Sequence, residues 1–229
     1  MAAIITSITG LQNLPNLQDF NADYNGLTTV NLSGLANLLY VDVSDNYIPN
    51  TEGQHSLTSV NLSGCTALQT LRLDDSDFSA GIPSLAGLNS LLWFDMDQCS
   101  ISGSIDVSGL PVLEGFDLSG NIGITNVTIS SSQPLGDGYE VLLGNNALTQ
   151  TVVDNILVAL AANSIDNGYV DLDGGTNAAP GSAGLAAIST LNGRGWSTNV
   201  NEPTTTTTTS SSTSTSTSTS TTTTTTTTV

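Results

Sequence analysis

The chain has 229 residues, and its 20 Asp and Glu against 2 Lys and Arg give a formal net charge of −18. Such an acidic surface repels nucleic acid and anionic membranes, so we expect neither as a partner. Residues 201–229 are mostly Ser and Thr, and we interpret them as a low-complexity tail because they have almost no apolar surface to bury. We therefore predict one folded domain over residues 1–200 and a tail over residues 201–229.

The apolar residues do not form a membrane segment. No apolar run approaches the ~20 residues that a membrane helix needs, so we expect no membrane insertion. The first residues also lack the basic start and long apolar core of a signal peptide. Cys65 and Cys99 are predicted to be buried free thiols, because both fall on core positions of the repeat described next.

An internal repeat runs through the first two thirds of the chain. Each unit has apolar residues at its first, fourth and sixth positions, Asn, Cys or Ser at the ninth, and an apolar residue near the eleventh. The units start at Leu17, Leu38, Leu68, Leu91, Leu113 and Gly138. They resemble the L-x-x-L-x-L-x-x-N/C-x-L pattern of leucine-rich-repeat proteins. The segments Leu27–Leu35 and Leu57–Cys65 resemble the bacterial and tailed-phage members of that family.

The fold class that we predict is therefore a leucine-rich-repeat solenoid, an α/β fold dominated by strands. The x-L-x-L part of each unit is a short strand, and stacked units place these strands side by side in a parallel, concave sheet. The side chain at the ninth position should satisfy backbone groups inside the turn. The second half of several units alternates apolar and polar residues, which predicts a mostly extended convex side.

Residues beyond 150 follow a different, helical pattern. Apolar spacing predicts a helix over residues 150–162, and Thr151 to Asp154 resembles a capping box. A second helix is predicted over residues 182–192, with Leu185, Ile188 and Leu191 pointing inward, followed by a last strand near residues 196–200. These helical units should close the C-terminal end, while the opening residues cap the N-terminal end.

Residues between the inward apolar positions of each strand should form the exposed face of the sheet. One row, called the acidic lane below, contains Asn21, Asp42, Arg72, Asp95, Asp117, Leu142 and Asp171. A neighbouring row places two aromatic residues, Tyr40 and Trp93, two strand spacings apart. Exposed aromatic rings beside carboxylates suit sugars or peptides. The candidate ligand-binding residues are Tyr40, Asp42, Arg72, Trp93, Asp95 and Asp117; the alternative is an acidic face that serves solubility alone.

Metal binding and catalysis have weaker signals. Asp74 and Asp97 would neighbour each other in an adjacent row, and Ca²⁺ prefers several oxygen ligands, so these two residues are a candidate calcium site. Without it, no cofactor is expected. The single histidine, His55, lies in an insertion and has no nucleophile or metal motif around it, which indicates a solvated loop residue. We therefore expect no enzymatic activity.

Two functions are consistent with these features. The first is a recognition or adhesion module that binds a surface glycan or protein through its concave face and is displayed on a cell surface or virion by its Ser/Thr tail. The second is a structural subunit of an extracellular fibre or virion, assembled through its stacked units or its tail. Alternating Thr and Ser have high β-propensity, so the tail is a candidate for self-association by strand pairing.

Overall fold

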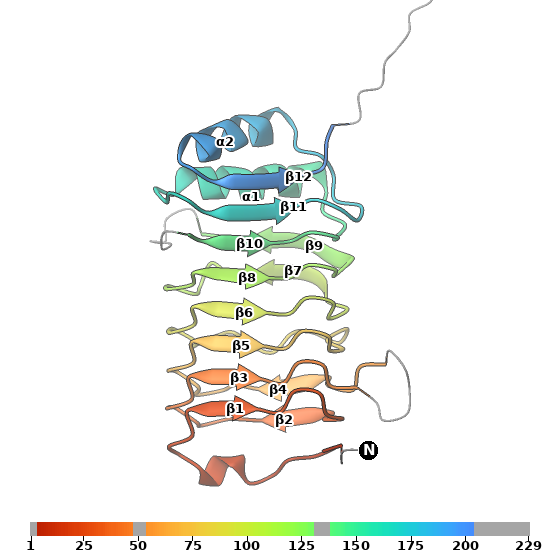
Figure 1. Ribbon diagram of the computed structural model, residues 1–229, viewed down its shortest axis with the longest axis vertical. Coiled ribbons are helices and arrows are strands. Elements are labelled where there is room, and N and C mark those ends of the chain that lie inside the picture. The colour runs from red at the N-terminus through yellow and green to blue at the C-terminus, as the bar shows by residue number, and fades with distance from the viewer. Residues whose placement is uncertain (1–3, 48–53, 131–137, 204–229) are drawn as a thin grey trace, which may run out of the picture.

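A computed structural model describes residues 4–47, 54–130 and 138–203. Its architecture is dominated by strands. The main element is a parallel sheet of eight short strands, which are stacked one after another along the long axis of the molecule (Figure 1). In sheet order, these strands are β1 (Asp19–Asn21), β3 (Tyr40–Asp42), β5 (Thr70–Arg72), β6 (Trp93–Asp95), β8 (Gly115–Asp117), β10 (Glu140–Leu142), β11 (Tyr169–Leu172) and β12 (Ser197–Val200). The arrangement is compatible with an α/β solenoid-like fold.

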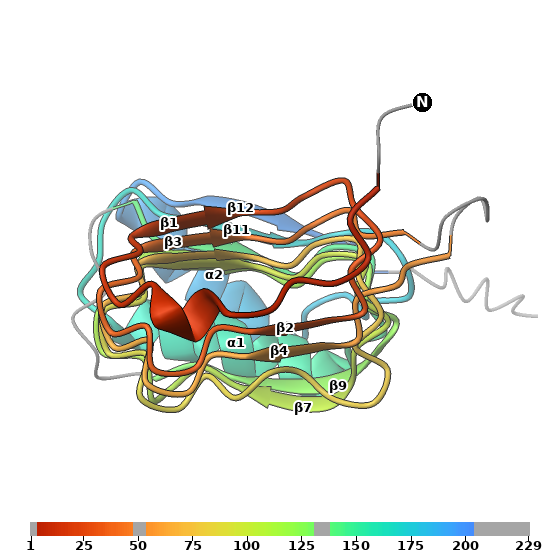
Figure 2. The same ribbon diagram turned by 90° about the horizontal axis from the view of Figure 1, so that it is seen from below.

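A second layer lies behind this sheet (Figure 2). It contains two small parallel sheets, formed by β2 (Thr29–Asn31) with β4 (Ser59–Asn61) and by β7 (Ser102–Asp106) with β9 (Gly123–Thr128). Toward the C-terminus two helices take the place of strands, α1 (Gln150–Ala162) and α2 (Ser182–Gly193). At the N-terminal end, residues 4–18 with the short 3₁₀ helix η1 (Leu11–Asn13) cover the space between the layers. Within the described residues no helix is long and apolar enough to cross a membrane.

The core fills the space between the two layers. The middle residue of each short strand points into it, so Val41, Leu71, Phe94, Phe116 and Val141 are all fully buried. The rings of Phe94 and Phe116 stack with their centroids 5.4 Å apart. The free thiols of Cys65 and Cys99 are buried as predicted, and they donate to the carbonyls of Leu32 and Leu73 respectively. The alternation of apolar and polar residues therefore identified the inward side of these strands correctly.

Buried asparagines join one unit to the next, where a unit is a strand of the large sheet with the chain that follows it. The Asn121 side chain is a clear case. Its Nδ2 donates to the carbonyls of Met96 and Leu118, and its Oδ1 accepts from the amides of Cys99 and Ile101. Asn46, Asn146 and Asn177 make similar bonds between neighbouring units. The bonds of Asn46, Asn121 and Asn146 confirm the predicted role of the ninth position in their units, and Asn177 plays the same part outside the predicted repeat.

The structure corrects two details of the predicted helices. The N-cap of α1 is Thr149, whose hydroxyl accepts from the amide of Val152, so the predicted capping box at Thr151 is wrong. Asp154 instead accepts a hydrogen bond from the amide of Gly181. In α2, Leu191 is buried, but Leu185 is 48% exposed and Gly184 is buried in its place.

A close approach of the two helices explains the rotation of α2. A Cβ at Gly184 would lie 2.3 Å from a carboxylate oxygen of Asp154 and 3.2 Å from Leu157, so only glycine allows α2 to sit this close to α1. Packing through Gly184 and Ala187 turns Leu185 away from the core. The predicted helix bounds and last strand agree with the structure, whereas the Ser/Thr tail from residue 204 onward lies outside the described residues.

Candidate functional site

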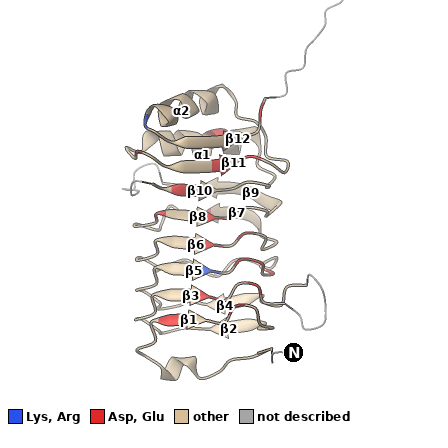
Figure 3. Cartoon of the chain, viewed as in Figure 1, with Lys and Arg blue, Asp and Glu red and all other residues tan. Residues whose placement is uncertain are grey.

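The candidate site lies on the outer face of the large sheet, the side to which the first and third residues of each strand point. Strand pairing without any shift between β3, β5, β6 and β8 places Asp42, Arg72, Asp95 and Asp117 in one row across neighbouring strands. The same pairing aligns Tyr40, Thr70, Trp93 and Gly115 in the adjacent row. Both predicted rows therefore exist, with Tyr40 and Trp93 separated by one strand. Acidic residues lie at the same end of β3, β6 and β8, and the corresponding residue of β5 is basic, Arg72 (Figure 3).

The ring of Trp93 packs directly against Gly115 of the neighbouring strand on this face. A Cβ at Gly115 would lie 2.4 Å from Cζ3 of Trp93 and 2.9 Å from its Cε3, so the six-membered ring fills the space that any larger side chain would need. Gly115 is buried beneath the ring, whereas Trp93 itself is only half-buried. The indole is thus held on the sheet by its contact with the glycine while part of it stays open to solvent. Sequence reasoning identified Trp93 but missed Gly115.

Asp42 differs from the expectation of an outward ligand-binding carboxylate. Its side chain points to the outer face but is only 7% exposed. One oxygen accepts from the hydroxyl of Tyr40 at 3.0 Å, and the other accepts from the amide and hydroxyl of Ser44 at 3.2 and 2.7 Å. These bonds bury Asp42 and fix the position of the Tyr40 ring, while ligand binding by Asp42 stays a prediction.

Arg72 lies between two of the carboxylates. Its Nε is 3.7 Å from Oδ1 of Asp74, and its Nη2 is 3.6 Å from Oδ2 of Asp95. Neither Nε nor that oxygen of Asp74 has a hydrogen-bond partner among the described residues, although both atoms are buried. Arg72 therefore forms two long ion pairs, one with Asp95 in the acidic lane and one with Asp74 beside it.

The carboxyl groups around Arg72 hold their protons more tightly than ordinary aspartates. Burial raises the pKa of Asp74 to about 6, in spite of the nearby guanidinium. Burial together with the charges of Asp74 and Asp117 raises the pKa of Asp95 to about 7. The pKa of Asp117 is also raised by burial, although hydrogen bonds from Ser119 oppose the shift. Near neutral pH this part of the face therefore carries less negative charge than its composition indicates.

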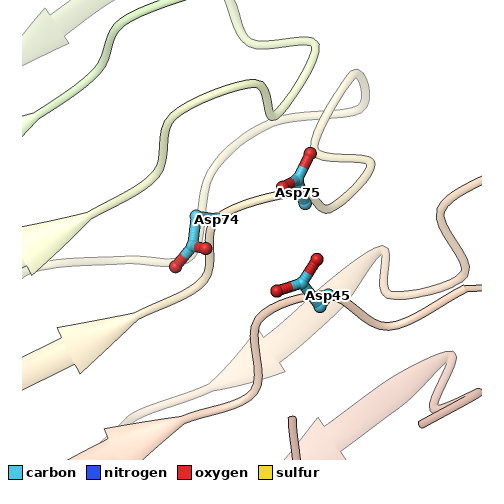
Figure 4. Close-up of side chains that lie close together, drawn as sticks. All are labelled: Asp45, Asp74 and Asp75. Carbon is cyan, nitrogen blue, oxygen red and sulfur yellow. The ribbon is translucent and has the colours of Figure 1, made fainter. Parts of the chain in front are cut away.

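The predicted metal pair, Asp74 and Asp97, does come together. With Asp95, these residues offer oxygen atoms that all lie within 4.8 Å of one another. A second group at the same separation contains Asp45, Asp74 and Asp75 (Figure 4). Hard oxygen ligands of this kind suit Ca²⁺, but Arg72 already faces Asp74 and Asp95 and would compete with a cation there.

The second acidic group was missed because Asp45 and Asp75 do not lie in a strand. Both have a left-handed backbone, with φ of 52°, in the turn that follows each strand. Asp and Asn tolerate this conformation better than most residues. The equivalent positions in other units hold Tyr24, Gln98, Gly120, Asn145 and Gly174, which also have positive φ. Gly, Asn or Asp at five of these seven positions was the signal that would have located the turn.

His55 is not the solvated loop residue that we expected. Its ring is half-buried and lies against Tyr47, with the ring centroids 5.2 Å apart. The two residues also form an isolated antiparallel bridge. The Tyr47 hydroxyl donates to Asp45 at 2.7 Å, which links this pair to the second acidic group.

Comparison with known proteins adds no family to this geometry. No protein-family model matches the chain, and no curated protein is significantly similar to it. The outer face of the sheet is the part of the molecule with features suited to a ligand. That face combines the indole of Trp93 packed on a glycine, a tyrosine held by a buried carboxylate, and carboxyl groups that can accept or donate hydrogen bonds near neutral pH.

Proposed function

We propose that the chain is a leucine-rich-repeat protein that works as a non-enzymatic recognition module. It binds a surface glycan or protein through the outer face of its eight-stranded sheet, the face that is concave in a leucine-rich-repeat solenoid. The matched strand register and the buried asparagines between units support this assignment of the family. Display on a cell surface or virion belongs to the same proposal.

The observation that carries the binding proposal is the packing of the Trp93 ring on Gly115. Trp93 stays partly open to solvent on this face, and a glycine in the neighbouring strand makes room for its ring. A ring fixed in this way loses little entropy when a ligand stacks on it. Carboxyl groups of Asp95 and Asp117 lie one residue row away, where they can bond to the hydroxyl or amide groups of a stacked ligand.

Binding to intact cells and to a glycan array tests this proposal. We expect Trp93→Ala to weaken binding at least about tenfold, because aromatic anchors at the centre of an interface contribute about 2 kcal/mol or more. Tyr24→Ala is the matched control, since Tyr24 is 71% exposed but lies in a turn outside both rows. If wild type and Trp93→Ala are both folded and bind with equal affinity, the outer face around Trp93 is not the binding surface.

Gly115→Ala tests whether the position of the Trp93 ring matters for binding. The added methyl group must displace the indole, because it would lie within 3 Å of Trp93 and of the carbonyl oxygen of Glu140. We expect binding to fall while the tryptophan remains in the chain. Gly109→Ala is the control, because no atom lies within 4 Å of a Cβ built there. Binding unchanged by Gly115→Ala would show that the position of the indole does not matter.

A further inference from the structure

The two ends of the molecule carry little charge, although the chain as a whole is strongly acidic: Arg194 at the end of α2 and Glu202 after β12 are the charged residues beside the C-terminal end. Residues 4–18, which form the N-terminal end, contain no Asp, Glu, Lys or Arg. The same is true of α2 and of β12, which form the C-terminal end (Figure 3). The formal charge of −18 is therefore concentrated between the ends and in the few charged residues that flank them.

Both ends also expose apolar side chains. Ile4, Ile5 and Leu14 are 51%, 47% and 50% exposed at the N-terminal end, and Leu185 is 48% exposed at the C-terminal end. These four are half of the large hydrophobic residues that are exposed in the described part of the chain.

The core itself is left partly open at the C-terminal end. Val170 and Leu172 of β11 are fully buried. Their pairing partners in β12, Thr198 and Val200, are only half-buried. Among the described residues β12 pairs with β11 alone. The last strand therefore has the pattern of an inner strand without a neighbour to cover it.

Charge indicates what covers these surfaces. A basic partner would be attracted to the acidic lane and the turns beside it rather than to the neutral ends. A second copy of the chain is repelled by that same acidic surface and can approach closely only where charge is absent. We propose that copies of this chain stack end to end, with the N-terminal end of one copy against the C-terminal end of the next.

The direction of stacking follows from the packing inside the chain. All pairs of neighbouring strands in the large sheet are parallel, so each unit presents one side to the unit before it and the opposite side to the unit after it. The two ends are therefore surfaces of opposite kind, and a head-to-tail contact repeats the sense of every internal contact. Such a heterologous contact does not close, and it produces open rows rather than a fixed dimer. The outer face stays free in these rows, so a ligand array would be bound with avidity.

Sedimentation velocity of the full-length chain over a wide concentration range tests the stacking. We expect species of increasing mass without a fixed end point, and we expect association to strengthen when NaCl is raised from about 0.1 to 1 M. The second expectation follows because the Debye length falls from about 10 to 3 Å, which screens the repulsion between the acidic bodies. A monomer at all concentrations and salt levels would overturn the proposal, including the case in which residues 204–229 cover the C-terminal end.

Two charge variants test the direction of stacking. Leu14→Asp places a charge on the N-terminal end, and Leu185→Asp places one on the C-terminal end. Val112→Asp is the matched control, because Val112 is 43% exposed between β7 and β8, far from both ends. We expect each end variant alone to associate at least about tenfold more weakly, and the control to behave as wild type, with circular dichroism melting confirming that all three fold.

An equimolar mixture of the two end variants is the decisive sample. Leu14→Asp retains an intact C-terminal end, and Leu185→Asp retains an intact N-terminal end, so the mixture contains one good interface and should form dimers that neither variant forms alone. Dimers of Leu185→Asp alone, or of Leu14→Asp alone, would show that like ends meet and would overturn the head-to-tail arrangement. These outcomes are independent of ligand binding, since none of the three variants changes the outer face.

Discussion

The two central units, which contain β5 and β6, differ from the units on either side of them. The flanking units hold a buried asparagine in the turn, namely Asn46, Asn121 or Asn146, and each makes several hydrogen bonds. The central units hold Ser76 and Cys99 at that position, and the buried Ser76 hydroxyl has no hydrogen-bond partner within the described part of the chain. The second layer also lacks a strand between β4 and β7 along the described chain.

The same central units contain most of the desolvated carboxyl groups. Asp74, Asp75 and Asp95 all belong to them, and each has a pKa raised by burial. Stability and chemistry are thus located in different places. Apart from Nδ1 of His55, the flanking units satisfy their buried polar groups among the described residues, whereas the central units leave three such atoms unsatisfied, on Arg72, Asp74 and Ser76. Unsatisfied polar groups of this kind agree with the binding site that we propose for the central units.

The largest effect that this comparison predicts is the loss of a flanking asparagine. Asn121→Ala leaves the buried amides of Cys99 and Ile101 without their acceptor and the carbonyl of Met96 without its side-chain donor, whereas the carbonyl of Leu118 keeps its bond from Asn146. Unsatisfied buried groups cost about 1–3 kcal/mol each, so we expect the free energy of unfolding to fall by about 3 kcal/mol or more. Urea unfolding followed by circular dichroism measures it.

Asn37→Ala is the control for this substitution. Asn37 is exposed, and its amide donates to the carbonyl of Pro15 at 2.9 Å, a bond that water can replace. We expect the control to lose less than about 1 kcal/mol. Similar losses in Asn37→Ala and Asn121→Ala would mean that the buried asparagines do not hold the units together.

Sequence reasoning located the flanking units better than the central site. The periodic apolar residues determine which side of each strand is buried, and the asparagine position follows from the turn, so strands, register and both helices could be predicted. The burial of Asp42 could not be predicted, because it depends on Tyr40 and Ser44 closing over it. The rotation of α2 depends on contact between Gly184 and Asp154, which are far apart in the sequence.

The next effect in size concerns pH. The pKa of Asp74 is raised to about 6 and that of Asp95 to about 7 in the folded chain, from an ordinary value of 3.8. A raised pKa means that the folded state binds the proton more tightly, so the stabilisation is complete below about pH 4 and is lost as pH rises through 6 and 7. We expect the melting temperature to fall between pH 4.5 and 7.5.

The size of this fall is limited by solvent. After allowance for screening by solvent, the free energy of unfolding should fall by about 1–2 kcal/mol over this pH range. In a chain of this length, 1 kcal/mol corresponds to a change of about 2–4 °C in melting temperature. Asp95→Asn should flatten the dependence, because its amide stays neutral across the range. Asp106→Asn is the control, since hydrogen bonds from Ser108 lower the pKa of Asp106 and remove it from this window. A melting temperature that rises toward pH 7.5 would contradict the assignment.

Calcium binding by Asp74 and Asp97 stays a prediction with a smaller expected effect. A ligand that binds only the folded state at ten times its Kd stabilises by about 1.4 kcal/mol. We expect 10 mM Ca²⁺ to raise the melting temperature more than NaCl of equal ionic strength, and Asp97→Asn to abolish the difference. Equal effects of the two salts would show that the aspartates respond to screening alone and would leave the chain without a calcium site.

The smallest effect is expected at the centre of the comparison. Ser76 is fully buried, and its hydroxyl has no hydrogen-bond partner among the described residues, so Ser76→Ala removes an unsatisfied group. We expect stability to stay within about 1 kcal/mol of wild type or to rise. Ser56→Ala is the matched control, because Ser56 is also buried but donates to the carbonyl of Leu27 at 2.8 Å, and it should lose about 1 kcal/mol. A larger loss at Ser76 than at Ser56 would show that the Ser76 hydroxyl is bonded, for instance to an ordered water, and that the central units are as well satisfied as their neighbours.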